Sequence, residues 1–260
     1  MENSPMNHVR TEGIDFSIMG DDMQLVDVEL DPGEGVRAEA GTMIYMSDGI
    51  EMQTDTGGIF KGFKRMVTGE SFFITSYTYT GAGKGNVAFA APYPGKIVPI
   101  DLSNHSGFLC QKDAFLCADQ DTEVEVAFTK KLGAGLFGGE GFILQRLTGS
   151  GWAFVHVGGT VVERTLQAGQ TLRVDTGCVA AFSGTVDYDI NFVGGFKNAL
   201  FGGEGVFLAK LTGPGKVYLQ SLPFARLADR IVAGQFANRG ESRGVGGTGI
   251  LGDLFGGNES

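Results

Sequence analysis

The chain has 260 residues, 42% of them hydrophobic, and its 30 acidic and 20 basic side chains give a formal net charge of −10. Such a chain can bury a substantial core, while its average electrostatic field repels a nucleic-acid backbone. The 43 glycines and 20 phenylalanines exclude a disordered or collagen-like chain and favour a turn-rich all-β fold.

The N-terminal segment has no apolar stretch behind its single arginine, and no apolar run reaches the roughly 18 residues of a membrane-spanning helix. We therefore expect neither a signal peptide nor a membrane span. Cys110, Cys117 and Cys178 lie in apolar, strand-like segments, which predicts free buried thiols. Together these features predict a cytoplasmic protein.

Alternating apolar and polar residues predict strands from early in the chain. In 36–40 the apolar residues alternate with Arg37 and Glu39, and the same period of two returns at 172–175 and 187–192. One face of such a strand packs on a core while the other meets water. Short turns rich in glycine, proline and aspartate separate these segments. The pattern predicts half-buried antiparallel strands.

A stretch of sixteen residues occurs twice. Residues 136–151 and 200–215 are identical at eleven positions, and the offset of 64 continues backward without a gap to align 97–128 with 161–192. Such self-similarity is the signature of a structural repeat.

A third copy occupies the first part of the chain. Residues 30–33 align with 166–169, and 69–74 align with 139–144. One unit is too small to be stable alone, so three units are expected to pack together. We predict three tandem repeats, each a β-sandwich or short double-stranded β-helix, around a pseudo-threefold axis, at residues 14–90, 91–156 and 157–221.

The rhythm changes after the last repeat. Phe224, Leu227, Ala228 and Ile231 recur at helical spacing behind a proline suited to a first turn, which predicts a helix over 222–238. Its apolar stripe is expected to pack on the third lobe or across a subunit boundary, so a homo-oligomer is one alternative. Glycine-rich residues 239–260 lack periodicity and predict a flexible tail.

These motifs resemble a known family. The Leu-Phe-Gly-Gly-Glu-Gly sequence at 136–141 and 200–205, together with 213–231, is similar to bacterial members of the mitochondrial-biogenesis (altered inheritance of mitochondria) family. The resemblance runs from about residue 16 to residue 231. It implies three lobes, each similar to the subunit of the tryptophan RNA-binding attenuation protein, and it carries over no catalytic residue.

The sequence predicts no enzyme site. His8, His105 and His156 occur singly, without the His-x-His pair that metal-binding β-helix enzymes use. The cysteines lack C-x-x-C spacing, and the Gly-x-Gly pairs interrupt strands instead of opening a helix. We therefore expect no catalytic residue, no cofactor and no metal.

One feature favours binding. Cationic and aromatic side chains precede the Gly-Glu turn of each repeat, and the repeat places them at one end of the lobes. This candidate interaction face consists of Lys61, Phe63, Lys64, Arg65, Lys130, Lys131, Phe137, Lys197 and Phe201. In the alternative interpretation the rings fold back and plug the lobes.

Glu70, Glu140 and Glu204 occupy equivalent turns in the three repeats. One interpretation is that each carboxylate accepts backbone N–H groups within its turn. The other is that the three converge on the axis and hold a cation.

The resulting expectation is a non-enzymatic binding or scaffolding module. Its partner is either an unknown protein or an anionic membrane surface, the latter through peripheral binding at the inner face of the membrane. The alternatives are a small-molecule-binding protein or enzyme with an inter-lobe pocket and, less favoured by the net charge, an RNA-binding protein.

Overall fold

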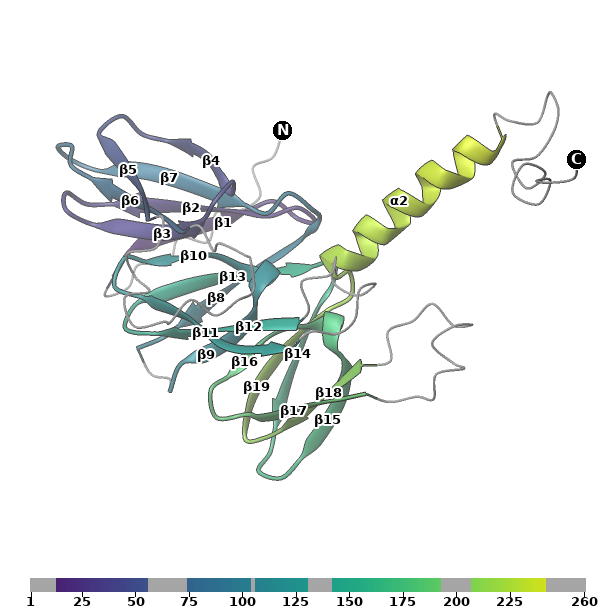
Figure 1. Cartoon of the computed structure of the whole chain (residues 1–260). Coiled ribbons are helices and arrows are strands. Elements are labelled where there is room, and N and C mark those ends of the chain that lie inside the picture. Colours follow the sequence, from purple (N-terminus) through teal and green to yellow (C-terminus); the bar gives the residue numbers. More distant parts are fainter. Residues whose placement is uncertain (1–12, 56–73, 104–105, 131–141, 193–206, 242–260) are drawn as a thin grey trace, which may run out of the picture. The chain divides into compact units, whose positions relative to one another are not determined.

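The computed structural model describes residues 13–55, 74–103, 106–130, 142–192 and 207–241 (Figure 1). The chain divides into two compact units, Met1–Ala225 and Arg226–Ser260, each of which is described by itself. The described strands lie in the first unit, and the second unit begins inside helix α2 (Phe224–Glu241). The prediction of an all-β fold with one C-terminal helix is confirmed, and the helix extends three residues beyond the predicted end at 238.

The strands recur in three groups of six, which we call lobes one to three. Lobe one follows an additional strand, β1 (Asp15–Met19), and its strands are β2 (Leu25–Leu30), β3 (Gly35–Glu39), β4 (Met43–Met46), β5 (Ile50–Asp55), β6 (Ile74–Tyr79) and β7 (Gly85–Ala90). Lobe two comprises β8 (Gly95–Asp101), β9 (Phe108–Gln111), β10 (Phe115–Asp119), β11 (Glu123–Lys130), β12 (Phe142–Thr148) and β13 (Trp152–Gly158). Lobe three comprises β14 (Val161–Leu166), β15 (Thr171–Asp175), β16 (Val179–Ser183), β17 (Asp187–Phe192), β18 (Phe207–Thr212) and β19 (Gly215–Gln220).

Every lobe uses the same pairing scheme. Its first, sixth and third strands form one antiparallel set, as in β8, β13 and β10, and its second, fifth and fourth strands form another, as in β9, β12 and β11. The third and sixth strands also share an irregularity: the register shifts between Met43 and Tyr45, between Phe115 and Cys117, and between Val179 and Ala181. A β-bulge at the same position in all three lobes shows that the lobes share this irregularity of the backbone as well as their strand order.

The lobes join edge to edge. The second strand of lobe one, β3, pairs with the third strand of lobe two, β10, placing Ala38 opposite Cys117. The second strand of lobe two, β9, pairs in the same way with β16 of lobe three, placing Cys110 opposite Ala181. We call these two pairings the first and second seams. They fuse neighbouring sets into two six-stranded sheets, ordered β5-β6-β3-β10-β13-β8 and β11-β12-β9-β16-β19-β14.

The series of lobes is open at both ends. The remaining sheets, β1-β2-β7-β4 and β15-β18-β17, place β4 and β15 at edges. A ring of three lobes closed by strand pairing would also join β15 to β4, and that pairing is absent from the sheets of the described strands. The pairing within the described part of the chain is therefore a head-to-tail row.

Seam strands differ from the half-buried strands that alternation predicts. Every residue of β9 and β16 is buried, because each lies inside a six-stranded sheet. Arg37 and Glu39, expected in water on the outer face of β3, are only partly exposed. The expectation that these two side chains face water is wrong because lobe two lies against β3 at the first seam.

Aromatic side chains pack between β1, which precedes lobe one, and lobe two. The Phe16 ring of β1 lies edge-on to Phe154 of β13, with centroids 4.8 Å apart, and also contacts Trp152 at 5.1 Å. Phe154 is fully buried in a core cluster that draws from both lobes. Burial of a phenyl ring contributes several times more to stability than one exposed contact does.

We expect Phe154→Ala to lower the free energy of unfolding by about 3 to 5 kcal/mol, because it leaves a cavity under Phe16. Urea unfolding followed by the fluorescence of Trp152, the one tryptophan of the chain, measures the loss. Met52→Ala, at a methionine that is 48% exposed, is the control and should change little. Equal losses in both variants would contradict a shared core at this junction.

Candidate functional site

The sequence-derived interaction face falls outside the described residues, apart from Lys130, whose backbone ends β11. The same is true of Glu70, Glu140 and Glu204 and of His105. The structure does describe the strand ends from which the three connections depart. Asp55 pairs with Ile74, Lys130 with Phe142 and Phe192 with Phe207, each joining the fourth and fifth strands of a lobe. The three connections therefore leave equivalent points, and the prediction about their side chains stays a prediction.

The described histidine and cysteines lie in the body of the protein. His156 is 2% exposed, Cys110 and Cys117 are fully buried, and Cys178 is partly buried. Burial raises the pKa of the Cys110 and Cys117 thiols, so both stay protonated at neutral pH. Within the described ranges no three metal-ligating side chains come together.

Ionisable side chains gather where lobes one and two meet. Glu39 ends β3, Tyr93 lies between β7 and β8, Asp113 lies in the short 3₁₀ turn Lys112–Ala114, and His156 belongs to β13. We call these four residues the junction set. The Tyr93 ring stands edge-on to the His156 imidazole at 4.4 Å, and its hydroxyl donates to the Asp113 carbonyl over 3.3 Å.

Burial gives this set unusual acid–base properties. It raises the pKa of Glu39 to about 7, helped by the Asp113 carboxylate and opposed by Lys112. It lowers the pKa of His156 to about 4, although a hydrogen bond to the backbone of Tyr93 opposes this shift. The imidazole Nδ1 is buried without a hydrogen-bond partner. The junction set therefore contains both a neutral histidine and a carboxyl group that exchanges its proton near neutral pH.

The second seam has the same geometry but different chemistry. Gln111 replaces Glu39 at the end of the second strand, and Gln220 replaces His156 on the sixth strand. The Gln220 amide donates to Gln111 over 3.2 Å and to the Gly177 carbonyl over 2.8 Å, and it accepts from the Gly158 N–H over 3.1 Å. A permanently neutral amide network holds this seam, so the ionisable groups of the junction set are not required by the fold.

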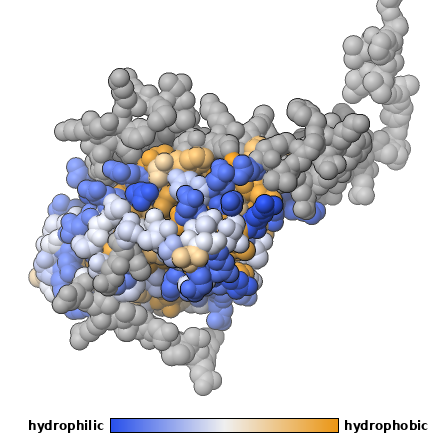
Figure 2. All heavy atoms as spheres, turned by 90° about the horizontal axis from the view of Figure 1, so that it is seen from below, coloured by the Kyte–Doolittle hydropathy of each residue, from blue (hydrophilic) through white to orange (hydrophobic). Residues whose placement is uncertain are grey.

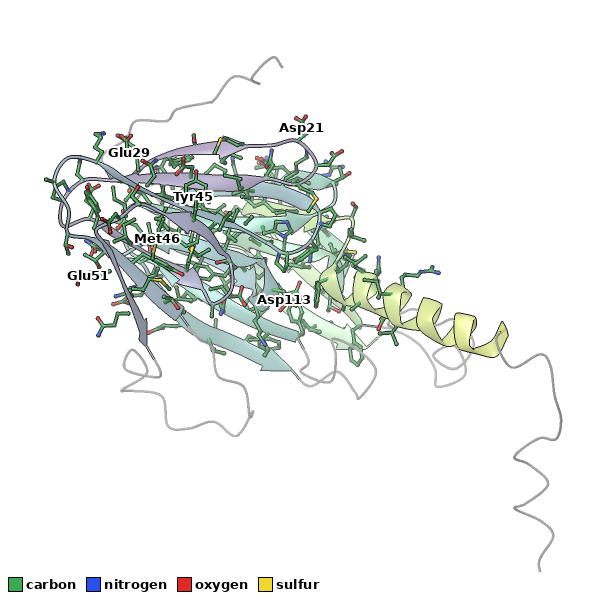
Figure 3. All side chains as sticks on the ribbon, turned by 90° about the horizontal axis from the view of Figure 1, so that it is seen from above. Asp21, Glu29, Tyr45, Met46, Glu51 and Asp113 are labelled. Atoms are coloured by element: carbon green, nitrogen blue, oxygen red, sulfur yellow. The ribbon has the colours of Figure 1, made fainter. Side chains whose placement is uncertain are left out.

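The other unusual feature is a hydrophobic strip on β4, formed by Ile44, Tyr45 and Met46 and named the β4 strip here. These side chains are 49%, 43% and 38% exposed. Figure 3, which looks onto lobe one, shows Tyr45 and Met46 on this edge strand. The Tyr45 hydroxyl donates to the Asp27 carboxylate over 3.0 Å, which orients the ring across the sheet.

Equivalent residues of the other lobes are buried. The offset of 72 places Leu116, Cys117 and Ala118 at these positions in lobe two, and all are at most 1% exposed. The residues of lobe three, at 180–182, are likewise at most 1% exposed. The repeat alignment shows that these residues are equivalent. It does not predict that 43–46 is exposed, because this segment is as apolar as its buried counterparts.

The junction set makes stability depend on pH. The pKa of Glu39 is about 7 in the folded state against 4.5 ordinarily, so its stabilising contribution is complete below about pH 4.5 and is lost as pH rises through 7. We expect Glu39→Gln to be more stable than the wild type by about 2 kcal/mol at pH 8 and nearly equal to it at pH 5. Urea unfolding at both pH values measures the difference.

His156→Gln is the matched control, because the pKa of His156 is shifted in the opposite direction. Its folded-state value of about 4 lies below the ordinary 6.5, so the wild type loses stability as pH falls from 6.5 towards 4. This variant should gain stability below pH 6.5 only. A difference between Glu39→Gln and the wild type that is the same at pH 5 and pH 8 would contradict the assignment.

Helix α2 does not bury the predicted apolar stripe within the described residues. Phe224 is 45% exposed, with its ring 5.3 Å from that of Tyr93, and Ile231 is 56% exposed. Burial across a subunit boundary stays a prediction. No helix in the described ranges combines the length and the apolar character that crossing a membrane requires.

Comparison with known proteins identifies relatives over most of the chain. The family model described as mitochondrial biogenesis AIM24 matches residues 16–222. An uncharacterized protein of Streptococcus pyogenes serotype M6 is 32% identical over 213 residues, which cover 78% of this chain and 84% of that protein. A crystal structure of a Streptococcus pyogenes protein is similar with a TM-score of 0.69 and 27% identity, over 85% of this chain and 99% of that one. The chain belongs to the mitochondrial biogenesis AIM24 family.

Proposed function

We propose that the chain is a non-enzymatic binding module that scaffolds a protein assembly, with the β4 strip as its docking surface. The observation that carries this proposal is the exposure of Ile44, Tyr45 and Met46 at positions that are buried in both other lobes. An exposed edge strand offers unpaired backbone groups as well as apolar side chains, and proteins use such edges to add a strand from a partner.

The charges around the strip suit a protein partner. Asp48 and Glu51 follow the strip in the chain and are exposed, and Asp27 accepts a hydrogen bond from the Tyr45 hydroxyl. Acidic groups surrounding an apolar centre form the polar rim that specific interfaces have. They also disfavour direct insertion of this surface into an anionic bilayer.

A charge on the strip should abolish docking. We expect full-length chain carrying Met46→Lys to lose the proteins that co-purify with the wild type after mild cross-linking in its native cells. Met52→Lys is the matched control: Met52 lies on β5, another edge strand, and is 48% exposed against 38% for Met46. Quantitative mass spectrometry of the three samples measures the loss, and identical protein sets in all three would contradict the proposal.

A membrane surface is the second candidate. It is supported by the equivalent strand ends from which the three connections depart, since the sequence of each connection contains the Phe and Lys residues of the predicted interaction face. Rings inserting at the lipid interface and cations facing anionic headgroups would add their contributions over three lobes.

We expect the wild type to bind vesicles containing anionic lipid weakly, and to dissociate as added salt screens the lysines. Phe63→Ser, Phe137→Ser and Phe201→Ser combined should abolish binding and leave the unfolding curve unchanged. Co-sedimentation with vesicles of phosphatidylcholine and phosphatidylserine tests this, with pure phosphatidylcholine as the control. A triple variant that fails to fold would show that the rings are core plugs, and absence of wild-type binding would exclude the membrane role.

A further inference from the structure

We propose that the occupant of the β4 strip is a second copy of this chain, bound through its β15 edge. This inference rests on the proposed scaffolding role and names its partner. The two open edges are of the same two kinds that meet at each internal seam: β4 is a third strand and β15 is a second strand. A copy of the chain therefore carries both halves of a third seam, which a neighbouring copy can complete.

The internal seams show that these edges fit each other. Ala38, Arg37 and Val36 of β3 face Cys117, Ala118 and Asp119 of β10. Cys110, Leu109 and Phe108 of β9 face Ala181, Phe182 and Ser183 of β16. Each residue pair of the second seam occupies the repeat positions of a pair in the first seam. The same contact therefore forms between lobes whose sequences differ.

The same offsets specify the register between copies. They place Tyr45 opposite Val174, Met46 opposite Arg173, and Ser47 opposite Leu172. Ser47 donates its N–H to Asn86 on β7, so the N–H groups of Met46 and Asp48 point to the free side of β4, as alternation along a strand requires. The backbone donors needed by a new strand are therefore correctly oriented.

Two specific hydrogen bonds support this register. Each internal seam ends in a backbone bond, from Gln120 to Gly35 at 3.0 Å and from Gly184 to Gly107 at 2.8 Å, and the equivalent bond between copies joins Asp48 to Thr171. At the first seam the Arg37 guanidinium also donates to the Thr122 carbonyl over 3.0 Å. Arg173 occupies the position of Arg37 on β15, where it would reach the carbonyl of Ile50.

Residues on the two open edges are exposed, as expected of strands that have no neighbouring lobe to pair with. On β15, Thr171 and Arg173 are exposed, whereas every residue of its counterpart β9 is buried. On β4, three of four residues are exposed, whereas those of β16 are all buried. Figure 2 shows the surface from below, the side on which lobe three lies in Figure 1, where hydrophobic residues are exposed between hydrophilic ones.

Other edge strands do not share this pattern. The fourth strands β5 and β11 are edges within the sheets, as are the first strands β8 and β14, and neither kind joins two lobes at either internal seam. Charge also favours the β4 and β15 combination, since cationic Arg173 would approach a region that contains Asp48 and Glu51. Because each copy has one edge of each kind, the association is head to tail.

The test measures the mass of the full-length chain by sedimentation velocity over a range of concentrations. The wild type should self-associate. Met46→Lys places a cation opposite Arg173 and should weaken association at least tenfold, whereas Met46→Glu places an anion there and should retain it. Met52→Lys is the control on another edge, and circular dichroism verifies that every variant folds.

A charge exchange tests the pairing itself. The chain that carries both Met46→Lys and Arg173→Glu should self-associate like the wild type, because the introduced cation of each copy then faces the introduced anion of the next. The chain that carries Met46→Lys together with Arg164→Glu on β14 is the control, and it should stay as weakly associated as Met46→Lys alone. A double variant no better associated than its control would contradict the pairing.

Cross-linking tests the register. Chains carrying Met46→Cys and chains carrying Arg173→Cys, mixed and oxidised, should form a disulfide between two copies, since directly opposed residues meet the distance requirement. Met46→Cys mixed with Arg164→Cys should not. A wild type that stays monomeric, or equal cross-linking in both mixtures, would overturn the inference. If co-purifying proteins are nevertheless lost with Met46→Lys, the scaffolding role survives with a different partner; if they are not, both fail.

Discussion

Edge-to-edge strand pairing between lobes is the interaction on which the rest of this structure depends. Two of the edges of a single lobe, those of its second and third strands, lie next to hydrophobic side chains that one lobe cannot cover. Pairing β3 with β10 and β9 with β16 covers four of these six edges and completes two six-stranded sheets. The antiparallel ladder sets the lobe-to-lobe register, because a slip of one residue would turn every buried side chain of the seam to the opposite face.

The two seams share this geometry but not their chemistry. Gln111 and Gln220 form a neutral amide network at the second seam, where every polar atom can be satisfied without a change of protonation. Glu39 and His156 occupy the corresponding positions at the first seam, and burial shifts the pKa of one upward and of the other downward. Since an amide network holds the second seam, the ionisable groups give the junction of lobes one and two a response to pH that this network lacks.

The repeat also shows why the exposure of the β4 strip is unusual. An apolar side chain at a protein surface is ordinary by itself, but Ile44, Tyr45 and Met46 are exposed where two equivalent triplets are covered by a neighbouring strand. Among the described strands, β4 and β15 are edges of the two kinds that pair with each other at the internal seams. The role in assembly that we propose rests on this relation between the two edges.

The sequence alone determined the strand content, the threefold repetition and the C-terminal helix. These properties are local or periodic: alternation along 172–175 requires no knowledge of distant residues, and the offset of 64 is visible in the letters of 136–151 and 200–215. The resemblance to the family rested partly on the same two segments. The sequence could also align 43–46 with 115–118, and it showed both to be apolar.

Only the tertiary structure decided which of these similar segments is covered. Burial of 115–118 depends on β3, whose residues lie about eighty positions away in the chain, and no local pattern states that β4 lacks such a neighbour. For the same reason Glu39, which alternation places in water, carries a pKa of about 7: lobe two removes most of its solvent. Strand pairing between distant segments is set by the competition among all available edges, and that competition exists only in the folded chain.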